Sequence, residues 1–333
     1  MRSVEPVAAA IVFATSYPSP GAKTSSADPP RRFVPARDLD PQGIKQEDTK
    51  MQQIAYVNGS FVPNVQATIS VTDRGFLFGD GIYEVSSVID GRLVDNELHL
   101  ERLQRSLGEI RIAMPAPIER IREIQLELIR ANALREGMVY IQVTRGSANR
   151  DFVFPSANVT PTLVMFTQEK NLVDTLSGTT GLKVMSFPDL RWARRDIKSV
   201  NLLAQVLAKQ AAAEAGCNEA WMLDGEMVTE GGSSTAYILT ANDTIVTRPR
   251  STKTLAGCTC AALQKLIAEQ GLKLEERPFS LSEAKAAKEA FATSATTLVA
   301  AVVEIDGEPI GDGKPGPIAT ELRRLYVEQA RIS

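Results

Sequence analysis

The chain has 333 residues, of which 44% are hydrophobic and 23% are charged, and its formal net charge is −3. This is an ordinary globular composition, and the length suits two modest domains with a substantial core. Acidic and basic residues are interspersed, which gives no indication of a nucleic-acid or membrane-surface protein. No apolar run in the sequence is long enough to cross a bilayer.

Residues 1–50 differ from the rest because they are rich in proline, serine and charged residues. This composition predicts a disordered or extended segment, with the folded protein beginning at Met51. Val7–Ala14 is only a weak match to the apolar region of a signal peptide, since Glu5 intrudes and no clean cleavage site follows.

From Met51 onward the apolar residues follow regular periods. Ala55–Val62 is expected to form a hairpin around Asn58-Gly59, and Tyr83–Val94 a second one around Asp90-Gly91. These dipeptides tolerate the positive φ angles of tight hairpin turns. Further elements are predicted as helices over 98–112 and 118–134, and as strands over 138–145 and 162–168.

The polar stretch 171–180 predicts a linker between a smaller domain, 51–170, and a larger cofactor-binding domain, 181–333. Strands in the second part are predicted over 182–187, 219–223, 227–229, 235–240 and 291–305. Helices there are predicted over 201–215, 259–270, 282–290 and 318–330. Because the strands come in clusters, the order favours an α+β fold over a doubly wound parallel sheet.

Cysteine and histidine usage limits the kinds of site that the chain can hold. Cys217, Cys258 and Cys260 are too few for a disulfide framework. Cys258 and Cys260 are poorly spaced as metal ligands, and no histidine is near them in the sequence, so we expect no metal. The single histidine, His99, falls in a helical pattern of leucines, where a helix-surface or packing role is expected. We expect a cytoplasmic protein.

The segment 191–203, RWARRDIKSVNLL, contains a candidate nucleophile, Lys198. It follows Arg191, Arg194 and Arg195, and it precedes the apolar start of a helix. Burial and neighbouring cations lower the pKa of an amine, and a neutral amine is what Schiff-base chemistry needs. Taken alone, however, a basic cluster of this kind is more often a solvated face.

Three further segments combine glycines with polar groups. MVTEGGSST, 227–235, places Glu230 and a Gly-Gly-Ser-Ser turn directly after a strand. TLAGCTCAA, 254–262, opens a helix, where free N–H groups form an anion site or where Thr259 is a plain N-cap. DRGFLFGDGIYE, 73–84, is rich in glycine and aromatic residues ahead of a strand. Each segment taken alone could be an ordinary turn.

In this order, and together with HLERL, VTRG, CNEAW and FATSAT, these segments resemble the class IV aminotransferases. The resemblance extends from about Tyr56 to about Tyr326 and is greatest to the D-amino-acid aminotransferases. It implies a two-domain, fold-type IV α+β architecture and a pyridoxal 5'-phosphate cofactor. It also implies ping-pong transamination between a D-amino acid, such as D-alanine, and a 2-oxo acid, such as 2-oxoglutarate, in a homodimer with a shared active site.

The resemblance implies a role for individual residues. Lys198 corresponds to the lysine that forms the Schiff base and shuttles protons, and Glu230 to the acid that keeps the pyridine nitrogen protonated. Arg102 corresponds to an arginine on the cofactor phosphate. The other expected cofactor contacts are Leu255 against the ring, the phosphate turn Cys258–Thr259, the hydroxyls of Ser233 and Ser234, and Ser294.

On the substrate side, Tyr83 and Arg150 correspond to groups that hold the substrate carboxylate, with Arg150 supplied by the neighbouring subunit. The family usually has Arg-x-His here, whereas this chain has Arg150-Asp151-Phe152, which removes one donor and makes that wall apolar. Ala256, Cys260 and Ala295 also stand where the family usually has other residues around the phosphate.

Phe152 therefore keeps alternatives of the same fold open. An (R)-selective amine transaminase would not need a full carboxylate trap, and a branched-chain L-amino-acid aminotransferase or an aminodeoxychorismate lyase would share the cofactor site. A non-catalytic binding relative is disfavoured by the presence of both Lys198 and Glu230.

Overall fold

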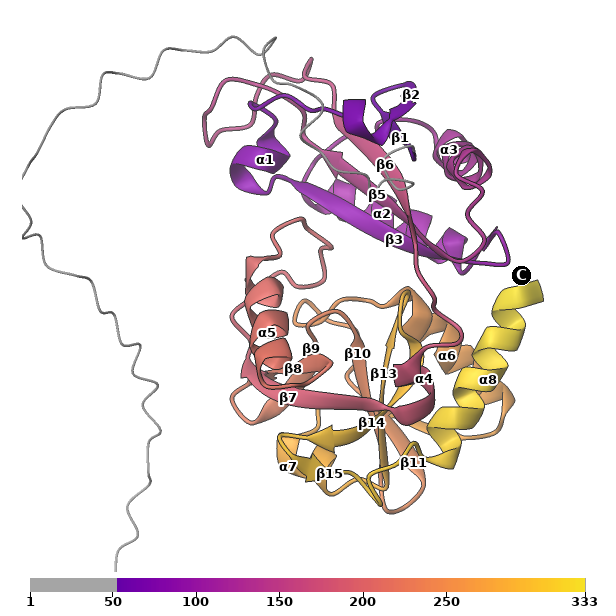
Figure 1. Cartoon of the computed structure of the whole chain (residues 1–333). Coiled ribbons are helices and arrows are strands. Elements are labelled where there is room, and N and C mark those ends of the chain that lie inside the picture. Colours follow the sequence, from indigo (N-terminus) through magenta and orange to yellow (C-terminus); the bar gives the residue numbers. More distant parts are fainter. Residues whose placement is uncertain (1–52, 333) are drawn as a thin grey trace, which may run out of the picture. The chain divides into compact units, whose positions relative to one another are not determined.

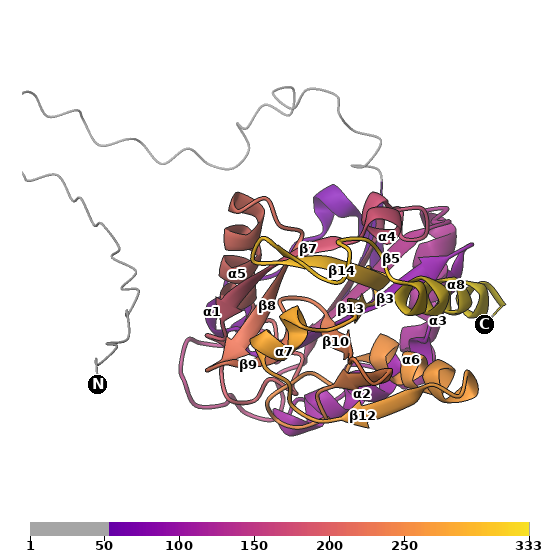
Figure 2. The same ribbon diagram turned by 90° about the horizontal axis from the view of Figure 1, so that it is seen from below.

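The structure is a computed structural model, and it describes residues 53–332. The predicted disordered extension, 1–50, lies outside these residues. The described residues form one compact unit, which contains a six-stranded and a nine-stranded sheet (Figure 1). Figure 2 shows the same unit from below. No helix among the described residues is long and apolar enough to cross a membrane.

The six-stranded sheet is antiparallel, with the order β2-β1-β6-β5-β3-β4. Its strands are β1 (Ile54–Val57), β2 (Ser60–Pro63), β3 (Gly81–Ile89), β4 (Arg92–Leu93), β5 (Gly137–Thr144) and β6 (Thr162–Glu169). Both predicted hairpins are confirmed, because Asn58 and Asp90 have positive φ angles of 47° and 52° and glycines follow them.

The helices of this half are α1 (Arg74–Phe78), α2 (Asn96–Glu109) and α3 (Ile118–Ala131), with a short 3-10 turn at Asn64–Gln66. Leucines and isoleucines of α2 and α3 pack against strands of the sheet in one buried cluster that includes Leu103, Ile124 and Ile82. Side chains alternate along β3, so Ile82 and Glu84 lie on one face of the strand and Tyr83 on the other.

The nine-stranded sheet is mixed, with the order β12-β11-β10-β13-β14-β7-β8-β9 and β15 paired to β14. Its strands are β7 (Leu182–Pro188), β8 (Glu219–Asp224), β9 (Met227–Gly231), β10 (Thr235–Leu239), β11 (Thr244–Thr247), β12 (Lys273–Glu276), β13 (Glu289–Ser294), β14 (Leu298–Ile305) and β15 (Glu308–Pro309). Parallel pairing occurs between β11 and β12, β14 and β7, and β7 and β8.

The prediction of one long strand over 291–305 was wrong. The chain turns after Ser294, where the Ser294 hydroxyl accepts from the Thr297 N–H, so the run becomes two antiparallel strands, β13 and β14. The predicted helix 282–290 ends early for a related reason, because Glu289 and Ala290 already pair with β10.

The helices of the second half are α4 (Leu176–Thr180), α5 (Leu203–Glu214), α6 (Cys258–Glu269), α7 (Leu281–Lys285) and α8 (Pro317–Ile332). The side chains of α6 and α8 form one buried cluster with β10, β13 and β14, and Trp221 and Phe279 belong to a second cluster. Helix α4 lies inside the stretch predicted as a linker. Within that stretch, Leu172 is buried and its carbonyl accepts from Arg323 of α8.

The two halves are joined through backbone pairing next to the predicted lysine. The Tyr83 N–H donates to the Lys198 carbonyl at 2.9 Å, the Val200 N–H donates to the Gly81 carbonyl at 3.1 Å, and Ser199 bridges Ile82. The segment 198–200 therefore extends from the edge of β3, which places Lys198 between the two sheets.

Candidate active site

A cavity between the two sheets is lined by residues of both halves of the folded unit. All the predicted cofactor residues contribute to its wall, and so does Tyr83. The predicted residues that the cavity brings together are Tyr83, Arg102, Lys198, Glu230, Ser233, Ser234, Leu255, Cys258, Thr259 and Ser294.

Arg150 and Phe152 do not line this cavity. The Arg150 guanidinium lies over the rings of Phe78 and Phe152, at 5.3 and 5.6 Å from their centroids. Phe152 is 78% exposed. Within one chain, therefore, these two predicted substrate residues lie apart from Lys198.

Lys198 is half-buried, and its Nζ lies 4.2 Å from the centroid of the Tyr83 ring. The arginines that precede it in the sequence do not form an unbalanced positive patch. Arg191 and Arg195 both pair with Asp189, and Arg194 pairs with Asp196 and Glu109.

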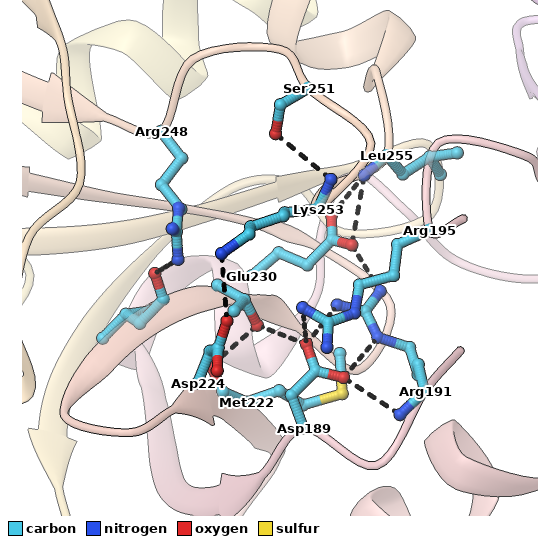
Figure 3. A network of polar contacts seen from close by, with 12 residues as sticks. Asp189, Arg191, Arg195, Met222, Asp224, Glu230, Arg248, Ser251, Lys253 and Leu255 are labelled. Carbon is cyan, nitrogen blue, oxygen red and sulfur yellow. Dashed lines mark hydrogen bonds and ion pairs between the residues drawn. The ribbon is translucent and has the colours of Figure 1, made fainter. Parts of the chain in front are cut away.

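Glu230 is buried at another wall of the cavity and is held from two sides (Figure 3). The Leu255 N–H donates to both of its oxygens at 3.2 Å, and Arg191 Nη1 donates to Oε1. Burial raises the pKa of Glu230, and this effect outweighs the lowering by the Arg191 guanidinium and the Leu255 N–H. A cationic or N–H donor in the cavity would favour the ionised form of Glu230.

The first turn of α6 forms a third wall. Its N-cap is Gly257, which offers no side-chain cap, so the N–H groups of this turn face the cavity without a side-chain acceptor. A Cβ at Gly257 would lie 2.9 Å from the Thr235 hydroxyl, so a larger residue would crowd this wall. Thr259 lies inside the helix, and the alternative of an N-cap at Thr259 was wrong.

Arg102 of α2 reaches this helix end and is held rigidly. Its Nε and Nη2 donate to the two oxygens of Glu84, both at 2.7 Å, and its Nη1 donates to the Ala256 carbonyl at 2.7 Å. Burial raises the pKa of Glu84, but the Arg102 guanidinium outweighs burial and lowers this pKa to about 2. Glu84 is therefore ionised throughout the neutral range.

His99 lies on the same face of α2 as Arg102 and is buried, so of the two expected roles, helix surface or packing, the structure supports packing. Its Nδ1 lies 2.8 Å from Glu84 Oε2. Burial lowers the pKa of His99, but hydrogen bonds to the Cys258 thiol and to Glu84 outweigh burial and raise it to about 9. Glu84 thus lies between the Arg102 guanidinium and an imidazole whose raised pKa favours its protonated form.

Glu84, His99 and Cys258 offer possible metal-ligand atoms within 4.8 Å of one another. Both oxygens of Glu84 already accept from Arg102, however, and the arginine would repel a cation at the same place. The cluster is therefore better described as an ion-paired network than as a metal centre.

The hydroxyl groups of the Gly-Ser turn have an acceptor within the protein. The hydroxyls of Ser233 and Ser234 both donate to Glu219, a buried carboxylate that also pairs with Lys209. Their O–H groups therefore point to this acid, and only their oxygen lone pairs and backbone groups remain for a ligand in the cavity.

Sequence reasoning missed Glu84, His99, Asp189, Arg191 and Glu219 as parts of the site. For His99 the signal was present, because His99 and Arg102 are spaced i, i+3 and share one helix face. The alternation along β3 likewise directs Glu84 toward α2. For Glu219 and Asp189 no local sequence pattern was available, because their serine and arginine partners are determined by the packing of the fold.

The fold and cavity have clear counterparts among known proteins. Residues 81–305 match the family model "Amino-transferase class IV". The chain is 38% identical over 281 residues to a D-alanine aminotransferase of Staphylococcus aureus (strain N315), which covers 83% of this chain and 99% of that one. It is 36% identical over 271 residues to a D-alanine aminotransferase of Bacillus licheniformis, covering 80% and 93%.

Solved structures of branched-chain amino acid aminotransferases share the fold. That of Escherichia coli has a TM-score of 0.79 at 20% identity, covering 84% of this chain and 95% of that one. Another, from T.th. and solved with pyridoxamine 5'-phosphate, has a TM-score of 0.77 at 23% identity, covering 84% and 94%. These identities support the fold and leave the substrate open.

This chain belongs to the class IV aminotransferases. It is a pyridoxal-phosphate-dependent enzyme of the fold-type IV α+β architecture, and its substrates are amino acids and 2-oxo acids.

Proposed function

We propose that this enzyme transfers the amino group of a D-amino acid, such as D-alanine, to a 2-oxo acid, such as 2-oxoglutarate, with pyridoxal phosphate attached to Lys198. The relatives at 36–38% identity are D-alanine aminotransferases and match over most of this chain, which supports the substrate class. The single observation that carries the proposal is that Lys198, Glu230 and the uncapped start of α6 line one cavity.

When bound, pyridoxal phosphate supplies an aldehyde that exchanges amines and a protonated ring that withdraws electrons. The buried carboxylate of Glu230 suits the ring nitrogen, because an ionised acceptor there favours the protonated ring. Leu255 offers an apolar side chain for contact with the ring. Its backbone N–H donates to Glu230, so the two residues lie side by side at the cavity wall.

The wall at α6 suits the phosphate. A guanidinium has five N–H donors, and Arg102 uses three of them on Glu84 and Ala256, which leaves two for a ligand. The backbone N–H groups of Cys258 and Thr259 and the two free N–H donors of Arg102 favour a phosphate dianion at this helix start.

Lys198 is the acid–base group of the proposal. With the cofactor bound, the Lys198 Nζ would take the proton from the substrate Cα as a general base and would donate a proton back as a general acid. Tyr83 lies against this amine and restricts where it can move.

A homodimer is part of the proposal. Apolar side chains on one face of α5, Leu203, Val206 and Leu207, are exposed, and Leu203 is 69% exposed. Phe76, Phe152 and Val153 are also exposed. Apolar groups of this kind are typical of subunit interfaces. In a homodimer Arg150 and Phe152 would face the cavity of the partner subunit, where Arg150 would bind the substrate carboxylate.

We also propose a cytoplasmic location, in keeping with three cysteines that are all free thiols. An (R)-selective amine transaminase is the second candidate, and the observation that favours it is the apolar, exposed side chain of Phe152 beside Arg150.

The test is a substrate panel. Purified protein with pyridoxal phosphate and 2-oxoglutarate is assayed with D- and L-alanine, D- and L-leucine, and (R)-1-phenylethylamine, with Lys198→Ala as the inactive control. We expect D-alanine to be the best donor. A preference for L-leucine would replace the proposal by the branched-chain activity, and a preference for the amine would replace it by the amine transaminase.

A further inference from the structure

A buried group of charges surrounds Glu230 at the wall of the cavity, which Arg191 and Arg195 also line (Figure 3). Its centre is Asp189, whose side chain is fully buried. Asp189 accepts from Arg191 Nε at 2.9 Å and Nη2 at 2.7 Å, and from the Thr229 hydroxyl at 2.7 Å. Arg195 Nη1 lies 3.2 Å from the same carboxylate.

The two-contact fork to Asp189 fixes the orientation of Arg191. With Nε and Nη2 both committed to Asp189, the remaining nitrogen, Nη1, is directed at Glu230 Oε1, to which it donates. A planar guanidinium that is bound through two of its nitrogens cannot rotate freely. Asp189 therefore determines the direction of the third nitrogen, Nη1.

Glu230 is then clamped between Arg191 and the Leu255 N–H. Oε1 accepts from both groups, whereas Oε2 accepts only from Leu255, so Oε2 keeps a lone pair for a donor in the cavity. Arg191 and Arg195 balance the charges of Asp189 and Glu230. Arg248 also contributes to the field at this cluster.

We propose that Arg191, aimed by Asp189, is a positioning residue that keeps Glu230 ionised and facing the cavity. This inference rests on the proposed role of Glu230 toward the cofactor ring. It is needed physically because burial alone would favour the neutral carboxyl of Glu230, and a neutral carboxyl could not hold the ring nitrogen protonated. The cation supplies the charge, and the two hydrogen bonds to Asp189 keep Nη1 directed at Glu230.

The test measures cofactor affinity rather than turnover. The dissociation constant of pyridoxal phosphate for the apo-protein is determined by fluorescence titration between pH 5.5 and 8.5, for the parent and for Arg191→Met. We expect Arg191→Met to weaken binding by about tenfold at pH 6 and by less than about threefold at pH 8, because Glu230 then takes up a proton at higher pH. Adding Glu230→Gln to Arg191→Met should abolish this pH dependence.

Two further variants serve as controls, one for the loss of the ion pair with Asp189 and one for the loss of an arginine from the same segment. Arg191→Met leaves Asp189 with fewer partners, so Asp189→Asn/Arg191→Met removes both charges of the pair and should fold while showing the same pH-dependent loss. Arg194→Met changes an arginine of the same segment that pairs only with Asp196 and Glu109. It should bind the cofactor like the parent at every pH.

The outcomes separate the two claims. If Glu230→Gln alone leaves cofactor affinity and turnover unchanged, the proposed role of Glu230 is wrong. If Glu230→Gln is impaired but Arg191→Met and the double variant lose affinity equally at pH 6 and pH 8, or not at all, Glu230 keeps its role and the inference about Arg191 is overturned.

Discussion

Arg102 and Glu84 are joined by two parallel hydrogen bonds, Nε to Oε1 and Nη2 to Oε2, both 2.7 Å long, and the Glu84 side chain is completely buried. The pair connects β3 to α2 and places the guanidinium at the start of α6, where its Nη1 reaches the Ala256 carbonyl. The same carboxylate orients His99. One buried acid thus positions both cations of the cluster beside α6.

Replacing Glu84 by glutamine should therefore affect stability as well as cofactor binding. Breaking a buried ion pair from one side leaves an uncompensated charge and typically costs about 3–5 kcal/mol. We expect a loss of this size in urea unfolding and weaker retention of pyridoxal phosphate. Glu123→Gln is the matched control, because Glu123 pairs with Arg120 at the surface and is 62% exposed; it should cost less than about 1 kcal/mol. Equal losses for the two variants would contradict the account.

The raised pKa of His99 predicts how stability depends on pH. The folded-state value of about 9 lies above the ordinary value of 6.5. The stabilisation from His99 is therefore fully present below about pH 6.5 and is lost as the pH rises through about 9. We expect this contribution to be about 3 kcal/mol. Glu84, Cys258 and Asp95 are the titratable groups around His99.

Urea unfolding of the parent and of His99→Gln at several values between pH 6 and pH 10 measures this contribution. The difference in unfolding free energy between the two proteins should be largest at pH 6 and should shrink toward pH 10. A difference that stays constant over this range would mean that His99 is neutral in the folded protein.

Arg150 decides between an amino-acid and an amine substrate. If Arg150 binds the α-carboxylate, Arg150→Ala should lower kcat/KM for D-alanine by about tenfold to a thousandfold, since hydrogen bonds to charged groups contribute roughly 1.5–3 kcal/mol and unpaired partners cost more. Turnover of 1-phenylethylamine should change far less. Arg135→Ala, at a position 80% exposed with only a long contact to Asp90, serves as the control. Equal losses on both substrates, or none, would remove Arg150 from the site.

Whether Arg150 acts on its own chain or on the partner can be measured by mixing inactive variants. Lys198→Ala and Arg150→Ala proteins are unfolded together, refolded and assayed with D-alanine. If Arg150 serves the partner, each mixed dimer has one intact site, and random pairing should restore about a quarter of the parent's sites. If Arg150 acts within its own chain, no mixed dimer has an intact site, and activity should remain at the level of the unmixed variants.

Much of the fold follows from local sequence signals. Turn dipeptides such as Asn58-Gly59 and periodic helices such as α2 and α3 are encoded within a few residues. The predictions of secondary structure that were wrong concern elements that depend on contacts between residues far apart in the sequence. The run 291–305 lacks a regular polar alternation because both β13 and β14 are buried almost throughout, so periodicity could not reveal the turn at 295–297. The exposed pattern of β12 likewise gave no strand signal.

The active site likewise combines residues that the sequence predicts with residues that only the packing of the fold brings there. Lys198, Glu230 and Arg102 stand in motifs whose order carries the family resemblance, and the structure brings them to one cavity. The partners of these residues were not predictable, because ion pairs such as Arg191–Glu230 and Arg102–Glu84 depend on how the elements pack. The position of Arg150 outside the cavity also follows from packing rather than from any local pattern.

The central claim is that pyridoxal phosphate is attached to Lys198. The most direct measurement is reduction of the cofactor-loaded protein with borohydride, followed by proteolysis and mass spectrometry of the labelled peptide. We expect the pyridoxyl group on Lys198, in the sequence that follows Arg195, and no stable label in Lys198→Ala. A label on Lys183 or Lys209, or an unchanged label in Lys198→Ala, would contradict the account.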